Sequence, residues 1–186
     1  MQSLIDTLIT ILRLESITGN ERALCDLLEQ KMLALQREHP QLQLNLQRFG
    51  DALVVNGAQH NSRPLIALAG HLDTVKGDAT GAKVHQDGDK IVGLGASDMK
   101  AGVAVMLQLL ESGILQSSPF NLVFVFYDGE EGPDENNGIY TVFEQAPLLK
   151  QAELALVLEP TDNTLQLGCM GSIHARITFK GKRAHS

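Results

Sequence analysis

Residues 122–127 have the sequence LVFVFY, a continuous apolar run, and residues 154–158 form a second such run, LALVL. Segments that are apolar on both faces are typical of strands in the middle of a covered, largely parallel sheet. LIALAG at 65–70 and LVV at 53–55 also favour strands, and the alternating leucines of 42–46 favour another. These segments predict the central sheet of the protein.

Helical periodicity surrounds the predicted sheet. The expected helices cover residues 4–12, 23–35, 99–113 and 139–144. Ser97 or Asp98 is the expected N-cap of the third helix, and Gly113 is its expected end. Helices that alternate with apolar strands predict an α/β fold, a three-layer α/β/α domain with a largely parallel mixed sheet.

The last part of the chain has a different pattern. From Ser172 to Lys180, polar and apolar residues alternate strictly, which predicts a strand with one face in water. We expect a boundary near residues 168–171. It divides the chain into residues 1–170, which form the α/β body, and residues 171–186, which begin a second, smaller domain.

Composition and charge exclude several classes of protein. The chain has 15 Lys and Arg against 22 Asp and Glu, a net charge of −7, and no basic run, so we expect no nucleic-acid partner. Asp6, Arg13 and Glu15 interrupt the apolar N-terminal stretch, which argues against a signal peptide and against a membrane span. Two cysteines are too few for a disulfide framework, so a cytoplasmic location is expected.

Four polar clusters lie where predicted strands end, which is where open α/β sheets bind their ligands. They are GHLD at 70–73, GASDMKAG at 95–102, YDGEEG at 127–132 and LEP at 158–160. Taken singly, each has an ordinary structural explanation. His71 could be a hydrogen-bonded structural histidine, and Asp98 could cap the helix that follows it. A carboxylate such as Glu159, at the end of a buried strand, must be exposed, paired or bound to a metal.

The combination favours a metal centre. Two cations held ~3.5–4 Å apart need a bridging carboxylate, terminal imidazole and carboxylate ligands, and a base for the shared water. His71 and Asp73 share one face of an extended chain, so Asp73 could orient the imidazole. Glu130 and Glu131 are adjacent and point in different directions, so one could bind metal while the other acts as the base.

At this point the sequence resembles a known family, the zinc aminoacylases and carboxypeptidases. The matching motifs are AGHLDTV at 69–75, GLGASDMKAG at 93–102, FYDGEEG at 126–132, VLEPTD at 157–162 and GKRAHS at 181–186. They occur in that family's order and at roughly its spacing, which makes the match specific. The resemblance implies a two-zinc catalytic domain, in which cobalt is expected to substitute for zinc, followed by an α+β lid domain that also serves in dimerisation.

The resemblance also implies a role for each residue. The implied metal ligands are His71 and Glu159 on one zinc, Asp98 as the bridge, and Glu131 on the second zinc. Asp73 is implied as the support of His71, and Glu130 as the general base. His185 is implied to polarise the substrate carbonyl from the lid, across a homodimer. Relatives also share a cis peptide bond directly after the residue that corresponds to Asp98.

Within the family, the motifs are most similar to one branch of succinyl-diaminopimelate desuccinylases. This implies hydrolysis of N-succinyl-LL-2,6-diaminopimelate to succinate and LL-2,6-diaminopimelate, a step of lysine biosynthesis. The same centre would serve another N-acyl amino acid, as in an acetylornithine deacetylase, or a dipeptidase or carboxypeptidase. A catalytically inactive chain is the third alternative.

The family's last zinc ligand is a histidine near the C-terminus, and this sequence ends at Ser186 without that motif. Four other histidines, His39, His60, His85 and His174, do not lie in it. We therefore expect the 186 residues to be the front part of a longer enzyme, to bind at most one metal ion well, and to show no measurable hydrolysis on their own.

Overall fold

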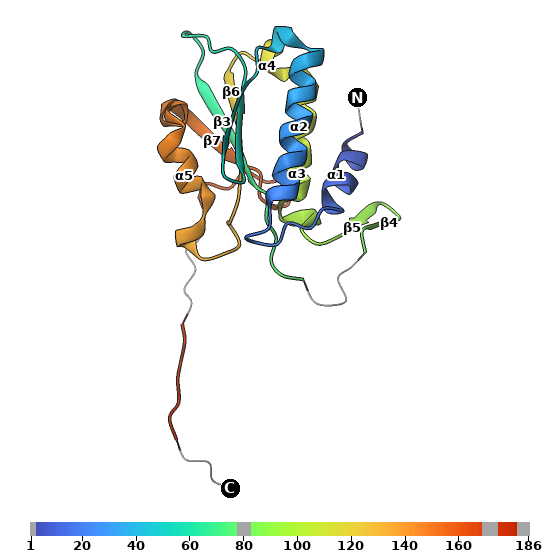
Figure 1. The fold of residues 1–186 in the computed structure, drawn as a ribbon, viewed down its shortest axis with the longest axis vertical. Coiled ribbons are helices and arrows are strands. Elements are labelled where there is room, and N and C mark those ends of the chain that lie inside the picture. The colour runs from blue at the N-terminus through green and yellow to red at the C-terminus, as the bar shows by residue number, and fades with distance from the viewer. Residues whose placement is uncertain (1–2, 78–82, 169–174, 182–186) are drawn as a thin grey trace.

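The structure is a computed structural model that describes residues 3–77, 83–168 and 175–181. A five-stranded sheet lies between two helical layers (Figure 1). Its strands are β1 (Asn45–Phe49), β2 (Ala52–Asn56), β3 (Leu65–His71), β6 (Asn121–Tyr127) and β7 (Ala152–Val157). Helices α1 (Leu4–Leu12), α2 (Arg22–Glu38), α3 (Ala101–Glu111) and α4 (Ile114–Ser117) lie on one side, and α5 (Gly138–Gln145) lies on the other. The predicted three-layer α/β fold is confirmed.

The order of the strands across the sheet is β1-β2-β6-β3-β7. β3 pairs in parallel with β6 on one side and with β7 on the other. β2 joins β6 antiparallel, and β1 pairs antiparallel with β2 at the edge. The sheet is therefore mixed, and its parallel part brings the carboxyl ends of β3, β6 and β7 to the same edge.

Strand β6 shows how the sequence builds two cores. Phe124 and Phe126 pack in the core under α1, α2 and α3, whereas Val123 and Val125 pack in the core on the α5 side. Because side chains alternate along a strand, a run that is apolar at every position buries both faces. This confirms the reading of 122–127 as a central strand.

Strand β7 does not have the central, covered position that the sequence analysis predicted for the apolar run at 154–158. It lies at the edge of the sheet as far as the structure describes the chain, and Leu154 and Val157 are 49% and 51% exposed. The apolar pattern predicted the strand correctly but did not predict its neighbours.

The start of α3 also differs from the prediction. Neither Ser97 nor Asp98 caps this helix. An irregular helical turn, Ala96–Lys100, comes first, and α3 begins at Ala101 with no side-chain cap. The small hairpin of β4 (His85–Asp87) and β5 (Lys90–Val92) was not predicted.

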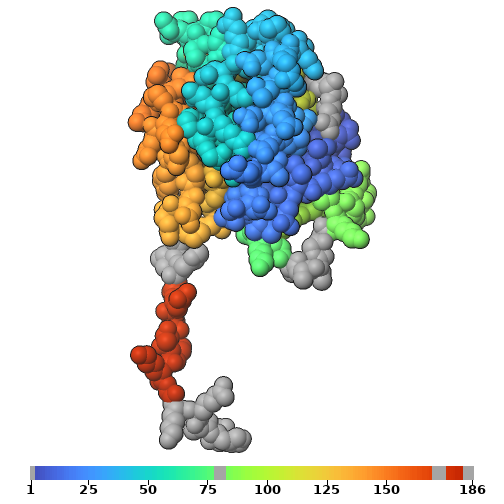
Figure 2. All heavy atoms as spheres, viewed as in Figure 1, coloured from blue at the N-terminus to red at the C-terminus, as the bar shows by residue number. Residues whose placement is uncertain are grey.

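The strand predicted over residues 172–180 is absent from the part of it that the structure describes. Residues 175–181 contain no strand and lie apart from the sheet and helices (Figure 2). A strand requires a hydrogen-bonded neighbour, and no described strand pairs with this segment. The expected boundary at 170–171 lies outside the described residues, so the division into domains remains a prediction. Within the described ranges, no helix has the length and apolar character needed to cross a membrane.

Candidate metal centre

The polar clusters of the sequence meet at the carboxyl edge of the parallel strands. His71 is the last residue of β3, Glu130 and Glu131 follow the end of β6, and Glu159 follows the end of β7. Asp98 comes from the turn that precedes α3. Segments far apart in the sequence therefore deliver one imidazole and several carboxylates to a single place.

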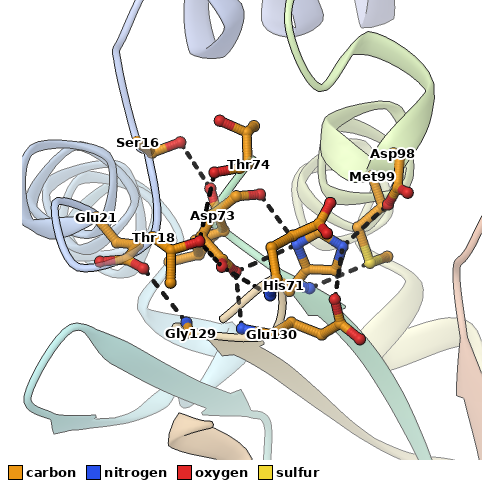
Figure 3. Close-up of polar contacts among 12 residues, drawn as sticks. Ser16, Thr18, Glu21, His71, Asp73, Thr74, Asp98, Met99, Gly129 and Glu130 are labelled. Carbon is orange, nitrogen blue, oxygen red and sulfur yellow. Dashed lines mark hydrogen bonds and ion pairs between the residues drawn. The ribbon is translucent and has the colours of Figure 1, made fainter. Parts of the chain in front are cut away.

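The His71 imidazole is the centre of this cluster (Figure 3). Its Nε2 atom lies 3.1 Å from Asp98 Oδ1, 3.8 Å from Glu159 Oε1 and 3.9 Å from Glu130 Oε2. The His71 side chain is only 1% exposed, whereas the Asp98 side chain is 53% exposed. The imidazole thus forms a buried floor, and the carboxylates form a rim that solvent can reach.

Asp73 determines which nitrogen of His71 faces the rim. His71 Nδ1 lies 3.0 Å from the backbone oxygen of Asp73 and 3.3 Å from its Oδ1 atom. Because a carbonyl oxygen can only accept, Nδ1 carries the proton, and Nε2 points toward the carboxylates. A histidine held in this way by a carboxylate can offer the Nε2 lone pair to a metal ion.

Asp73 also holds the loop that carries the two glutamates. Its side chain is fully buried, and its Oδ1 and Oδ2 atoms accept hydrogen bonds from the backbone N–H groups of Glu130 and Glu131 at 3.0 and 2.9 Å. Thr18 Oγ1 donates to Oδ2 at 2.8 Å. Burial by itself raises the pKa of Asp73, but the hydrogen bonds from His71, Glu131, Thr18 and Glu130 outweigh it and hold this pKa below its ordinary value.

The Asp98 turn is anchored from two sides. Met99 is fully buried, and its sulfur accepts a hydrogen bond from His71 N at 3.1 Å. Lys100 is 2% exposed, and its Nζ donates to Leu14 O at 2.9 Å, just beyond the end of α1. The peptide bond between Asp98 and Met99 is cis, as the resemblance implied.

The electrostatics of the cluster reflect its excess of negative charge. Burial lowers the pKa of His71, but the hydrogen bond that its ring donates to Asp73 and the charge of Glu159 prevail and raise this pKa to about 9. Burial raises the pKa of Glu159 to about 7, and the nearby Asp98 and Glu130 carboxylates act in the same direction. Without a cation the site therefore retains protons that an ordinary exposed histidine and glutamate would lose.

The donor set fits a divalent metal ion. Two groups have ligand atoms within 4.8 Å of one another: His71 with Asp98 and Glu159, and His71 with Glu130 and Glu131. One imidazole nitrogen with two carboxylate oxygens is a common set of protein ligands for zinc. Asp98 and Glu131 also line a shared cavity of about 390 Å³ next to this cluster.

The structure thus brings together every candidate of the sequence analysis that it describes: His71, Asp73, Asp98, Glu130, Glu131 and Glu159. His185, the implied residue of the lid, lies outside the described residues.

Comparison with known proteins places this arrangement in a family. Residues 67–180, more than half of the chain, match the peptidase family M20/M25/M40. The chain belongs to this family.

Relatives of this M20 chain include two desuccinylases. It is 36% identical over 123 residues to the succinyl-diaminopimelate desuccinylase of Corynebacterium glutamicum, an alignment that covers 65% of this chain and 33% of that protein. It is 37% identical over 146 residues to succinyl-diaminopimelate desuccinylase 2 of Shewanella loihica. This alignment covers 69% of this chain and 38% of that protein. The M20 chain therefore spans between 33% and 38% of the length of these relatives.

Solved structures of the family include peptidases. A tripeptidase from Staphylococcus aureus superposes with a TM-score of 0.63 at 26% identity, over 84% of this chain and 42% of that one. An M20 family metallo-carboxypeptidase from Sulfolobus solfataricus superposes with a TM-score of 0.62, over 85% of this chain and 37% of that one. At 18% identity the second likeness shows the fold alone.

Two residues of the M20 site were missed by the sequence analysis. Thr18 donates to Asp73, and Glu21 accepts from the backbone N–H of Gly129 at 3.3 Å. Both lie between the helices predicted over residues 4–12 and 23–35, where the sequence analysis assigned no role. No sequence pattern marked them, because the burial of Glu21, which requires hydrogen-bond donors for its carboxylate, appears only in the structure.

Proposed function

We propose that this M20 chain carries the metal-binding part of a hydrolase that cleaves the amide bond of an N-acyl amino acid. The observation that supports the proposal is the orientation of His71. Its Nδ1 atom is fixed by Asp73, and its Nε2 atom faces three carboxylates within 3.9 Å at the carboxyl edge of the sheet. Such a donor set suits a divalent cation, whose charge would offset the repulsion among the carboxylates.

His71, Asp98 and Glu159 would hold the first metal ion. Glu131 would hold a second ion, with Asp98 shared between the two and with a histidine that the family places in a part this chain does not span. Zinc is the proposed metal, and cobalt is expected to replace it. A divalent ion bound here supplies Lewis acidity, which lowers the pKa of a water molecule and polarises the amide carbonyl.

The chain's own residues then handle the proton. Glu130 is the proposed general base: its Oε2 atom lies at the rim, 3.9 Å from His71 Nε2, and its side chain is 39% exposed, so it can meet a water molecule. Glu130 takes a proton from that water and returns it to the leaving amine. His185 is proposed to hydrogen-bond the substrate carbonyl oxygen.

N-succinyl-LL-2,6-diaminopimelate is the proposed substrate, because the desuccinylases of Corynebacterium glutamicum and Shewanella loihica are similar in sequence. A small peptide is the second candidate, favoured by the likeness to the Staphylococcus aureus tripeptidase at 26% identity. The two candidates differ in the acyl group that must be recognised.

The test compares a protein that spans the full family length with the 186-residue chain. Both are stripped with a chelator, reloaded with zinc or cobalt, and assayed with the succinylated substrate, N-acetylornithine, a dipeptide and a tripeptide. We expect metal-dependent turnover of the succinylated substrate by the longer protein alone, and one tightly bound ion in the 186-residue chain. Among the described residues both candidate metal groups share His71, so one Nε2 atom cannot complete two separate sites.

Equal turnover by chelated and reloaded protein would contradict the metal mechanism. Turnover of the peptides in place of the acyl amino acids would keep the metal centre and replace the proposed substrate class.

A further inference from the structure

The segment of residues 16–21, SITGNE, connects α1 with α2 and lies against the end of β3; we call it the strap. Thr74 N donates to Ser16 O at 2.9 Å, and Thr18 N donates to Thr74 O at 3.1 Å. Ser16 Oγ also donates to Leu72 O at 2.7 Å. The strap is thereby fixed to the two residues on either side of Asp73 (Figure 3).

Thr18 contacts two residues that surround the candidate metal ligands, one with each branch of its side chain. The hydroxyl donates to Asp73 Oδ2 at 2.8 Å. The methyl group packs on Gly132, where an added Cβ would lie only 2.7 Å from Thr18 Cγ2. One side chain therefore supports the carboxylate that orients His71 and also limits how closely the end of the 129–132 loop can approach.

Glu21 holds the other end of the same loop. Its side chain is buried, and its Oε1 atom accepts from Gly19 N at 2.8 Å and from Gly129 N at 3.3 Å. Gly129 has a φ of 72°, a left-handed conformation in which its N–H points toward the strap. Between these two anchors, the N–H groups of Glu130 and Glu131 bind Asp73.

We propose that Thr18 and Glu21 are positioning residues of the metal centre, which set Asp73 and the 129–132 loop so that Glu130 and Glu131 face His71. The inference rests on the proposed metal-binding function. Neither residue touches the candidate metal ligands directly: Thr18 acts through Asp73, and Glu21 acts through Gly129.

A purely structural role of the strap makes a different prediction. Loss of a buried hydrogen bond would then lower the free energy of unfolding but would leave the geometry of the bound metal unchanged. A positioning role predicts a change in metal affinity and in the coordination of the ion. Direct partners of metal ligands typically change affinity about 10- to 100-fold, so we expect residues that act through one further residue to lie at the lower end of this range.

The experiment uses Co²⁺ as the probe, because its visible absorption reports coordination number and geometry. A protein of the full family length, in which Glu131 serves the second metal site, is titrated with Co²⁺, and the affinity and the visible spectrum are compared among matched pairs of variants. Thr18→Val removes the hydroxyl and keeps the branched shape, whereas Thr18→Ser keeps the hydroxyl. Glu21→Met removes the acceptor, whereas Glu21→Gln retains an oxygen that can accept from Gly129.

We expect Thr18→Val and Glu21→Met to weaken Co²⁺ binding roughly 10-fold and to change the visible spectrum of the bound ion. Thr18→Ser and Glu21→Gln should keep most of the wild-type affinity and a spectrum close to that of the wild type. Thr10→Val is the control, since the Thr10 hydroxyl donates to Asp6 O within α1, away from the cluster. It should leave affinity and spectrum unchanged.

The outcomes separate the two proposals. Failure of the wild-type chain to bind Co²⁺ would overturn the metal-binding function and this inference with it. The inference alone would be overturned if the wild type binds Co²⁺ and the folded Thr18→Val and Glu21→Met variants bind it with the same affinity and the same spectrum. Circular dichroism identifies the folded variants, and should Thr18→Val not fold, the Glu21 pair decides by the same criterion.

Discussion

Glu130 and Glu131 show how two identical, adjacent residues receive different surroundings. Their backbone N–H groups bind the two oxygens of Asp73, which fixes the chain between them. From this fixed backbone, Glu130 Oε2 reaches to 3.9 Å from His71 Nε2, whereas Glu131 lines the cavity next to Asp98. Burial and the charge of Asp98 raise the pKa of Glu131.

This difference leads to a paired prediction. In a protein of the full family length, Glu130→Gln should reduce turnover by about 10²- to 10⁴-fold, because an amide cannot take a proton from water, and should leave the metal content normal. Glu131→Gln should lose metal from the second site, because a neutral amide is a weaker ligand. Metal content by mass spectrometry and turnover of the same samples measure both effects. Loss of a stoichiometric ion from Glu130→Gln would identify Glu130 as a ligand.

At the scale of elements, the position of Glu159 depends on how closely α3 approaches the end of β7. Gly102 lies in the first turn of α3, and a Cβ there would come within 2.5 Å of Leu158 O and 2.9 Å of Leu158 Cβ. Leu158 N donates to Ala69 O at 3.0 Å, so this backbone is held by β3 and cannot easily move away. The missing side chain of Gly102 is what allows the helix to pack next to the residue before Glu159.

We therefore expect Gly102→Ala to lower the free energy of unfolding by about 1–2 kcal/mol, because the cost of overpacking exceeds the gain in helix propensity of about 1 kcal/mol. Metal affinity should fall as well, because Glu159 is displaced. Urea unfolding and a cobalt titration measure the two effects. Val105→Ala, at an exposed position of the same helix, is the control and should change stability by no more than about 0.5 kcal/mol. A stabilised Gly102→Ala variant would contradict this account of the packing.

At the scale of the whole molecule, the proton content of the site couples to stability. The pKa of His71 is raised from 6.5 to about 9, and that of Glu159 from 4.5 to about 7. Between pH 5 and 8 the folded chain consequently binds more protons at these groups than the unfolded chain does. Stability must then fall as the pH rises through this range. The opposite contribution of Asp73, whose pKa is lowered, is lost only at more acidic pH.

We predict that the chelated chain is more stable at pH 5.5 than at pH 8, and that added zinc or cobalt reverses this order. A cation competes with the protons on His71 and Glu159, so its affinity increases as the pH rises and these protons are lost. Thermal unfolding at both values of pH, with chelator and with metal, is the measurement. The double variant His71→Asn with Glu159→Gln should show neither the metal effect nor most of the pH trend. A chelated chain that becomes more stable toward pH 8 would show that other groups dominate.

The sequence by itself determined most strands and helices of the α/β body and the imidazole and carboxylate residues that meet in the candidate centre. The apolar run at 122–127 became a strand buried on both faces, and the periodic stretches at 4–12 and 23–35 became α1 and α2. The side chains that follow the parallel strands met at one edge. Local patterns suffice for these features, because periodicity sets which faces are apolar and the ends of parallel strands share an edge.

Only the tertiary structure decided which segments became neighbours. Packing between distant segments placed β7 at the edge of the sheet and β6 between β2 and β3. It also directed the Asp98 side chain toward His71 and not into a helix cap. The contacts of Thr18 with Asp73 and of Glu21 with Gly129 span 55 and 108 residues of the sequence. Local propensity acts over a few residues, whereas such contacts form only when the whole core brings distant segments together, and a sequence pattern near Thr18 or Glu21 carries little information about them.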